Sequence, residues 1–261
     1  MSIEKRLIDN FVYKVSYFAK QIATMKVVKG DHVTIVDAGL PSDTFNVIGI
    51  HHKKALVENT FLNHLETFKK KEYPLSVWFW NTYDDMFKRE LEKEGLVEAE
   101  TNIAMVKELG YGEKSSELPR GFEIHLAEKS EDVTHFGELI ASFFGESQEG
   151  KAVKAYYEKV ASSIDMQSSY LKLYIGKADG KPVTTGSIIV AKDSIGIYDM
   201  GTSDTERGKG YGSAMFQYLL QEAVQYNKKW CFLQASPEGF AIYEKAGFES
   251  IGEMNVFEWE K

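Results

Sequence analysis

The chain alternates between segments whose apolar residues recur at helical spacing and short apolar runs that are typical of strands. In the first half, helical spacing predicts helices over 3–24, 54–70 and about 84–94, with Asp84 as the cap of the third and Gly95 as its end. Apolar runs predict strands at 32–36, 45–50 and 75–80, and a pair of strands over about 96–109.

A polar segment at 110–119, with two glycines and a proline, separates this half from a second set of elements. In that set, strands are predicted at 122–126, 194–202, 229–235 and 249–259, with a hairpin over 170–190. Helices are predicted at 131–145, 150–166, 214–224 and 236–248, the last capped by Ser236. The order β-α-α-β-β-β-α-β-α-β predicts an α/β fold with a mixed sheet and helices on its faces.

The most distinctive loop is the glycine-rich segment 202–213, which joins a predicted strand to a predicted helix. Such a turn presents unpaired backbone N–H groups at the positive end of a helix dipole, where a phosphate or pyrophosphate binds well. Its three alternating glycines let the backbone approach a ligand closely, and Arg207 and Lys209 add positive charge. The spacing fits neither a Walker A loop nor a dinucleotide fingerprint.

Composition excludes several classes of protein. The 261 residues have a formal net charge of −8, which argues against non-specific nucleic-acid binding. We find neither a signal-peptide pattern nor an apolar run long enough for a membrane span, so a cytoplasmic protein without a membrane partner is expected. Cys231 is the single cysteine, and His51 and His52 lack further ligands at metal spacing, so no disulfide or metal is expected.

Two motifs together resemble those of the GCN5-related N-acetyltransferase (GNAT) family. Arg207, Gly210 and Gly212 match the pattern Arg/Gln-x-x-Gly-x-Gly/Ala of that family's acetyl-CoA loop. Later in the chain, Tyr243-Glu-Lys-Ala-Gly-Phe248 resembles the family's Ala-x-x-x-Tyr-x-x-x-Gly-Phe motif, with Gly239 in place of the alanine. The resemblance implies the GNAT fold for the second half and an acetyl-CoA-dependent N-acetyltransferase that needs no metal.

The resemblance also implies roles for individual residues. Tyr243 would protonate the departing CoA thiolate, a task that suits a phenol because it stays protonated near neutral pH. Backbone of the loop would hold the pyrophosphate, and the strand before it would bind the pantetheine arm. The cofactor-binding residues implied in this way are Met200, Gly201, Thr202, Arg207, Gly208, Lys209, Gly210, Tyr211, Gly212, Ser213 and Ser236.

The base and the acceptor are less well defined. Some family members carry a glutamate where this chain has Gly196, so Asp199 on the same strand is a candidate base, with a water chain as the alternative. The acceptor is expected to be a primary amine of a small molecule or peptide. A non-catalytic acyl-CoA-binding regulatory module is the alternative function, and the protein could be a monomer or a homodimer.

The first half resembles the second when the chain is shifted by 152 residues. The shift places Trp78 on Trp230, but it also places Leu91 on Tyr243 and the glycine-free segment 55–60 on the loop at 207–212. We therefore expect two tandem GNAT-like domains: a degenerate one over 1–112, a linker at 113–120 and a catalytic domain over 121–261. One cofactor site per chain follows.

Overall fold

The computed structural model describes residues 1–80, 85–110, 117–237 and 239–259. Its α-helices are α1 (Ile3–Ser16), α2 (Asn59–Lys71), α3 (Asp85–Lys93), α4 (Ser130–Ser142), α5 (Gln148–Ser163), α6 (Tyr211–Gln225) and α7 (Phe240–Lys245). Two short 3₁₀ helices, η1 (Lys53–Val57) and η2 (Asp204–Glu206), precede α2 and α6. The predicted cap Asp84 and the first half of the predicted linker, 113–116, lie outside the described residues.

The strands form one mixed sheet with the order β1-β2-β3-β4-β11-β5-β10-β9-β8-β7-β6 in the described part of the chain. The first half contributes β1 (Lys26–Lys29), β2 (Val33–Asp37), β3 (Val47–Ile50), β4 (Ser76–Trp80) and β5 (Leu96–Glu108). The second half contributes β6 (Phe122–Leu126), β7 (Leu171–Ala178), β8 (Lys181–Val190), β9 (Ser194–Thr202), β10 (Trp230–Ala235) and β11 (Glu249–Trp259). This architecture confirms the predicted α/β class with a mixed sheet.

The last strand of each half is exchanged between the halves. Strand β5 of the first half pairs with β10, and β11 of the second half pairs with β4, while β5 and β11 also pair with each other. All of these pairings are antiparallel, so each half is completed by a strand of the other. Because the sheet is continuous across the exchange, the division at about 113–120 stays a prediction about sequence organisation.

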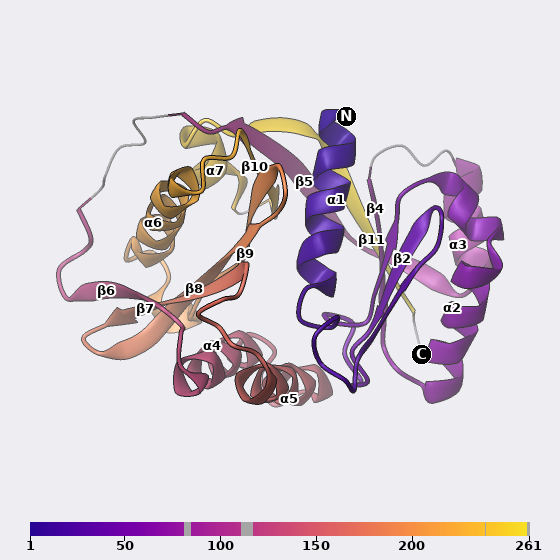
Figure 1. Ribbon diagram of the computed structural model, residues 1–261, viewed down its shortest axis with the longest axis horizontal. Coiled ribbons are helices and arrows are strands. Elements are labelled where there is room, and N and C mark those ends of the chain that lie inside the picture. The colour runs from indigo at the N-terminus through magenta and orange to yellow at the C-terminus, as the bar shows by residue number, and fades with distance from the viewer. Residues whose placement is uncertain (81–84, 111–116, 238, 260–261) are drawn as a thin grey trace.

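Helices cover both faces of the sheet (Figure 1). On one face, residues of α1, α4 and α5 pack with the sheet in a common core. On the other face, α2 and α3 cover the first half, and α6 covers the second. Helix α1 stands near the middle of the molecule, between the two halves, and contacts β2, β3, β8 and β9 (Figure 1).

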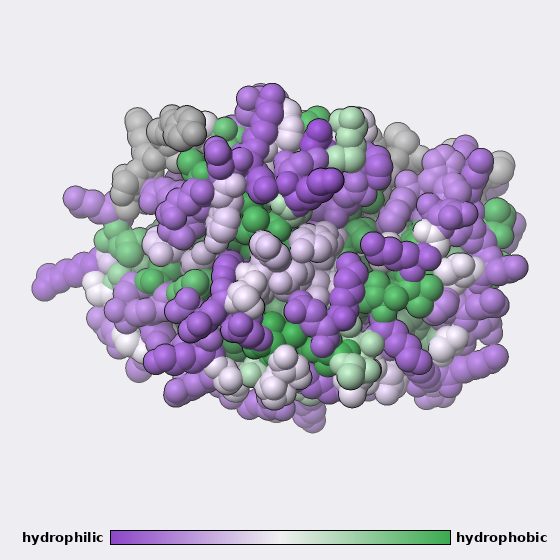
Figure 2. Space-filling model, viewed as in Figure 1, coloured by the Kyte–Doolittle hydropathy of each residue, from purple (hydrophilic) through white to green (hydrophobic). Residues whose placement is uncertain are grey.

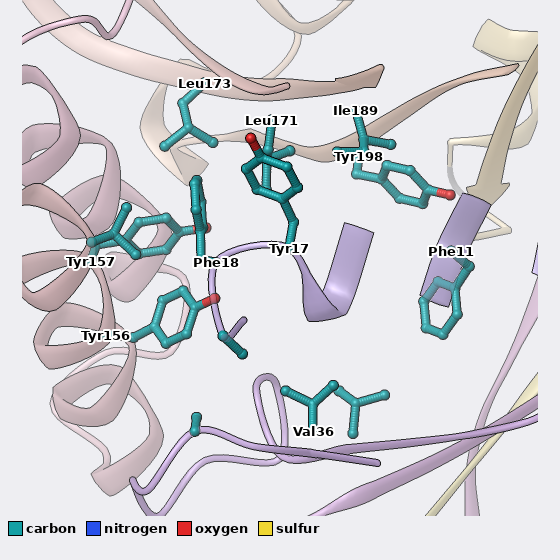
Figure 3. Close-up of a cluster of buried hydrophobic side chains, with 14 of the residues drawn as sticks. Phe11, Tyr17, Phe18, Val36, Tyr156, Tyr157, Leu171, Leu173, Ile189 and Tyr198 are labelled. Carbon is teal, nitrogen blue, oxygen red and sulfur yellow. The ribbon is translucent and has the colours of Figure 1, made fainter. Parts of the chain in front are cut away.

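The segment after α1 anchors this central helix in the core. Periodicity predicted a helix to residue 24, but α1 ends at Ser16, whose hydroxyl donates to the carbonyl of Val12 at 2.7 Å. Figure 3 shows Tyr17 and Phe18 between α5 and the strands of the second half. The hydroxyl of Tyr17 accepts a hydrogen bond from the backbone N–H of Tyr170 at 2.7 Å. Burial of consecutive apolar side chains therefore replaces the predicted last turns of the helix.

Three other sequence predictions were wrong in detail. The predicted strand pair over 96–109 is instead the single long strand β5. Its first part pairs with β11 and its last part with β10, so the segment continues as one strand. Strand β1, at the sheet edge, was missed because only two of its four residues are apolar and lysines flank them. The helix predicted from Ser236 begins only at Phe240, with Gly239 as its N-cap.

The remaining surface is mainly polar. Hydrophilic side chains cover most of the face seen in Figure 2, and hydrophobic side chains show between them in separate patches. Within the described ranges, no helix is both long enough and apolar enough to span a membrane. Cys231, the single cysteine, is fully buried in β10.

Candidate active site

The glycine-rich loop presents backbone N–H groups at the start of α6. Gly208 and Gly210 have φ angles of 78° and 87°, which glycine adopts at little cost. Gly210 is the N-cap of α6 and has no side chain to cap the helix. The N–H of Ala214 donates the first helical hydrogen bond to the carbonyl of Gly210 at 2.9 Å. The first-turn N–H groups of α6 precede that bond, so they can bind an anion at the positive end of the helix.

The charged side chains of the loop are paired within the loop. Arg207 lies 3.1 Å from Asp204, and Lys209 lies 2.9 Å from Glu206, with all four side chains at least partly exposed. The hydrogen bond to Glu206 raises the pKa of Lys209. Because these pairs offset each other in charge, the backbone N–H groups are the main anion-binding feature of the loop.

A split in the sheet lies directly before this loop. Strands β9 and β10 run parallel, but their pairing ends at Gly196 and Phe232, so the later residues of β9 have no β10 partner in the described ranges. Asp199 has a φ of 54°, and the β8–β9 register shifts between Thr185 and Ser187, which is the geometry of a β-bulge. The bulge turns the end of β9 away from β10 and leaves a backbone edge for a ligand.

The loop, the split and α7 enclose a cleft of about 630 Å³. All of the predicted cofactor-binding residues line it except Lys209, which is turned toward Glu206 instead. Prediction from sequence missed four further lining residues, namely Glu206, Phe216, Gly239 and Ile242. Gly239 and Ile242 belong to the recognised tyrosine motif, four residues and one residue before Tyr243. Which residues face the cleft, however, depends on how α6 and α7 pack.

Tyr243 lies at the inner end of the cleft. Its ring packs edge-on against Phe216, with 4.8 Å between the ring centroids and 73° between the ring planes. Burial raises the pKa of the Tyr243 phenol, so the hydroxyl is protonated at neutral pH. A Cβ added to Gly239 would come within 3.1 Å of the Tyr243 ring, so a residue as small as glycine leaves room for this ring position.

Ser236 belongs to the site without capping α7 directly. Its hydroxyl accepts a hydrogen bond from the N–H of Gly239 at 3.3 Å, and its carbonyl accepts one from the N–H of Phe240 at 3.1 Å. Ser236 therefore shapes the turn that leads from β10 into α7 and to Tyr243.

Asp199, the candidate base, is held on two sides. Lys14 of α1 lies 2.7 Å from its Oδ1, and the hydroxyl of Ser187 donates to its Oδ2 at 2.6 Å. The Asp199 side chain lines a second cavity and not the cofactor cleft. Asp199 thus has a structural role in the bulge, and its use as a base stays a proposal.

The second cavity measures about 440 Å³ and lies between α1 and the opposite face of the sheet. It shares Met200, Ser236 and Tyr243 with the cofactor cleft. The two spaces therefore meet at the split between β9 and β10, with the Tyr243 side chain at the junction. A molecule bound in the cleft and a molecule bound in the second cavity would therefore come into contact at this split.

The corresponding region of the first half is closed. Element bounds follow the 152-residue shift: Asn59 begins α2 and Tyr211 (59 + 152) begins α6, and Ile50 ends β3 where Thr202 (50 + 152) ends β9. However, β3 stays paired with β4 through Ile50 and Phe79, so no split forms. Leu91, the counterpart of Tyr243, is fully buried. In the described part of the first half, the counterparts of the β9–β10 split and of Tyr243 therefore provide neither an opening nor a phenol.

Other candidate chemistry is not supported. Within the part of the chain that the structure describes, no group of three or more His, Cys, Asp or Glu side chains is arranged to hold a metal ion. His52 accepts a hydrogen bond from the N–H of Lys54 at 3.2 Å and so caps η1.

Known proteins resemble this chain both in the sequence of its second half and in its fold. Residues 142–260 match the family model described as an acetyltransferase (GNAT) domain. No curated protein matches the chain. A solved GCN5-related N-acetyltransferase from Kribbella flavida is 15% identical, with a TM-score of 0.69 over 100% of this chain and 97% of that chain.

Two further solved structures share the fold over nearly their whole length. A functionally unknown conserved protein from Staphylococcus epidermidis is 18% identical, with a TM-score of 0.63 over 90% of this chain and 94% of that chain. A tandem GNAT protein from the clavulanic acid biosynthesis pathway is 9% identical, with a TM-score of 0.57 over 98% of this chain and 95% of that chain. At these identities the likeness concerns the fold. The domain match assigns residues 142–260 to the acetyltransferase (GNAT) family, whose fold supports acetyl transfer as the class of activity, and the solved structures share the fold over nearly the whole chain.

Proposed function

We propose that the protein is an acetyl-CoA-dependent N-acetyltransferase with one active site, at the split between β9 and β10. The observation that carries this proposal is the position of Tyr243, which lines both the cofactor cleft and the second cavity. A proton donor at the junction of two binding spaces suits a transfer reaction between two substrates.

The residues of the cleft fit acetyl-CoA. A Cβ placed on Gly208 or Gly210 would meet no atom within 4 Å, so the loop leaves open space beside its backbone. The first-turn N–H groups of α6 would bind the pyrophosphate. The unpaired edge of β9 at Met200–Thr202 would accept the pantetheine amides in the manner of an added strand. Bound there, acetyl-CoA supplies an acetyl thioester at the inner end of the cleft.

The proposed reaction consists of attack, protonation of the leaving group and loss of a proton from the product. The neutral acceptor nitrogen attacks the thioester carbonyl carbon, and a C–N bond forms as the C–S bond breaks. The hydroxyl of Tyr243 gives its proton to the departing sulfur and is reprotonated from solvent. The extra proton on the acceptor nitrogen leaves to water or to the Asp199 carboxylate, so the products are an N-acetylated amine and CoA thiol.

The direct test has two steps. Isothermal titration with acetyl-CoA measures binding, and a thiol assay with a panel of primary amines measures acetyl-dependent CoA release. Binding with amine-dependent CoA release supports the proposal. Binding without CoA release from any amine would favour the alternative, a non-catalytic acyl-CoA-binding regulatory module, and absence of binding by the folded protein would contradict both functions.

A further inference from the structure

The second cavity has a strongly acidic wall. Among the described lining residues, its carboxylates are Asp43, Glu100, Asp199 and Glu258, and its cation is Lys14. Lys14 is already paired with Asp199 at 2.7 Å. Among the described lining residues, no second cation therefore balances the other three carboxylates, Asp43, Glu100 and Glu258.

The exchanged strands bring these carboxylates together. In the register of the sheet, Glu258 of β11 faces Ser76 of β4, and Val256 of β11 lies between Trp78 of β4 and Glu100 of β5. Alternate residues of a strand share a face, so Glu258 and Val256 point to the same side of the sheet. The acidic end of the cavity thus exists only because β11 and β5 lie side by side.

Asp43 is held at this end by its backbone and its neighbours. The hydroxyl of Ser76 donates to the carbonyl of Asp43 at 2.8 Å, and the indole N–H of Trp78 donates to the Ser76 hydroxyl at 2.9 Å. The neighbouring Ser42 hydroxyl donates to Glu149 of α5 at 2.5 Å. The loop that carries Asp43 is therefore fixed from both halves of the chain.

Repulsion among the carboxylates of this wall is unfavourable. Burial, with Glu149 and Glu100 as nearby negative charges, raises the pKa of Asp43 to about 6. Burial, together with Asp43, Glu100 and Glu149, likewise raises the pKa of Glu258 to about 6. Like charges held close together in a partly buried place destabilise the free protein, and a bound cation would offset that repulsion.

The rest of the wall suits an organic ligand. Phe11 of α1, Trp78 of β4 and Tyr198 of β9 line the same cavity and supply apolar and aromatic surface. Gln234 also lines the cavity, beside Tyr198, and adds a polar amide to this surface. The cavity thus combines carboxylates with apolar and aromatic side chains, as a site for an organic cation requires.

We propose that the acceptor is an aliphatic amine with a second positive charge, a diamine or short polyamine, whose distal ammonium lies among Asp43, Glu100 and Glu258. This inference rests on the proposed N-acetyltransferase function and names the substrate class of that same site. The reacting nitrogen lies toward Tyr243, and the methylene chain lies along the aromatic surface between the two ends. A volume of about 440 Å³ accommodates such a small molecule.

The test compares two amines that differ by one charge. 1,5-Diaminopentane and pentylamine have the same carbon chain and the same reacting group, so their ratio of kcat/KM isolates the contribution of the distal ammonium. We expect the diamine to be preferred by about tenfold or more, mainly through KM. Glu258→Gln and Asp43→Asn should each reduce this preference several-fold.

Glu253→Gln is the matched control. Glu253 lies on the same strand, β11, but is exposed and does not line the cavity, so its loss should leave the preference unchanged. Equal kcat/KM for the two amines, or a preference that survives in the Glu258→Gln/Asp43→Asn double variant, would overturn the inference while leaving the acetyltransferase intact.

Direct titration of the diamine into the protein separates this inference from the proposed function. Diamine binding that Glu258→Gln weakens, without any CoA release, would support the cation site and contradict the transferase. CoA release from other amines with no diamine binding would support the transferase and contradict the cation site.

Discussion

Lys14 Nζ lies 2.7 Å from Asp199 Oδ1, which joins the first helix of the chain to the bulge that splits β9 from β10. Both side chains are mostly buried, at 18% and 17% exposure. The residue with the left-handed backbone conformation is therefore held by a partner 185 positions earlier in the chain. The first half thus supports the opening of the site in the second half.

The ion pair predicts a specific pattern of stability. Lys14→Met leaves the Asp199 carboxylate buried without its cation, so we expect the free energy of unfolding to fall by about 1–3 kcal/mol. Asp199→Asn should cost a similar amount, because it leaves the mostly buried Lys14 ammonium without its anion, while asparagine tolerates the same positive φ and adds no backbone strain. Urea unfolding of both single variants and the double variant measures the coupling, and strictly additive effects would show that the pair does not interact in solution.

The loop glycines predict a loss of cofactor affinity that differs from a loss of stability. Gly210→Ala places a Cβ in open space but at a φ of 87°, which costs about 1 kcal/mol. Gly180→Ala, in the β7–β8 turn at a φ of 80° and also in open space, carries a similar cost far from the cleft.

Both glycine variants should lower the melting temperature by similar amounts, and only Gly210→Ala should weaken acetyl-CoA binding in isothermal titration. Similar affinities in the two variants would remove the loop from the binding site.

Tyr243 predicts a change in turnover without a change in binding. Tyr243→Phe keeps the packing on Phe216 but removes the proton donor, so kcat should fall by about 100-fold or more while acetyl-CoA affinity stays within about twofold. Tyr218→Phe on α6 is the control, because Tyr218 lines neither cavity and should leave kcat unchanged. Undiminished turnover in Tyr243→Phe would exclude the acid role.

The acidic wall predicts a dependence of stability on pH. Asp43 and Glu258 have pKa values of about 6 in the folded protein, above their ordinary values of 3.8 and 4.5. Between those limits the folded state binds more protons than the unfolded state, so acidification from pH 7.5 to about 5 stabilises the protein through these groups. Because both carboxyls are partly exposed, we expect about 1 kcal/mol or less from each.

Asp43→Asn and Glu258→Gln should therefore each raise the melting temperature above that of the wild type at pH 7.5. At pH 5 the melting temperatures of variant and wild type should differ less than they do at pH 7.5. The same acidification should raise KM for a diamine, because protonated carboxyls attract a cation weakly. A lower melting temperature for both variants at pH 7.5 would contradict the repulsion between these groups.

Local sequence determined the main elements and the position of the glycine-rich loop between β9 and α6. Helical spacing located most helices, and Arg207, Gly210, Gly212 and Tyr243 lie where their motifs predict, on one cleft. These features are readable because a loop's conformation and a helix's apolar face depend on neighbours within a few residues. The loss of the first-half site was also readable, since segment 55–60 has no glycine and Leu91 replaces the phenol.

Only the tertiary structure decided how the two halves join. The exchange of β5 and β11, the bulge at Asp199 and the gathering of Asp43, Glu100 and Glu258 involve residues far apart in the chain. Apolar alternation identifies a strand, but its partner is chosen by packing across the whole sheet, and β5 and β11 would each have suited either half. The second cavity is a product of that choice, because Glu100 and Glu258 come from the two exchanged strands where these meet.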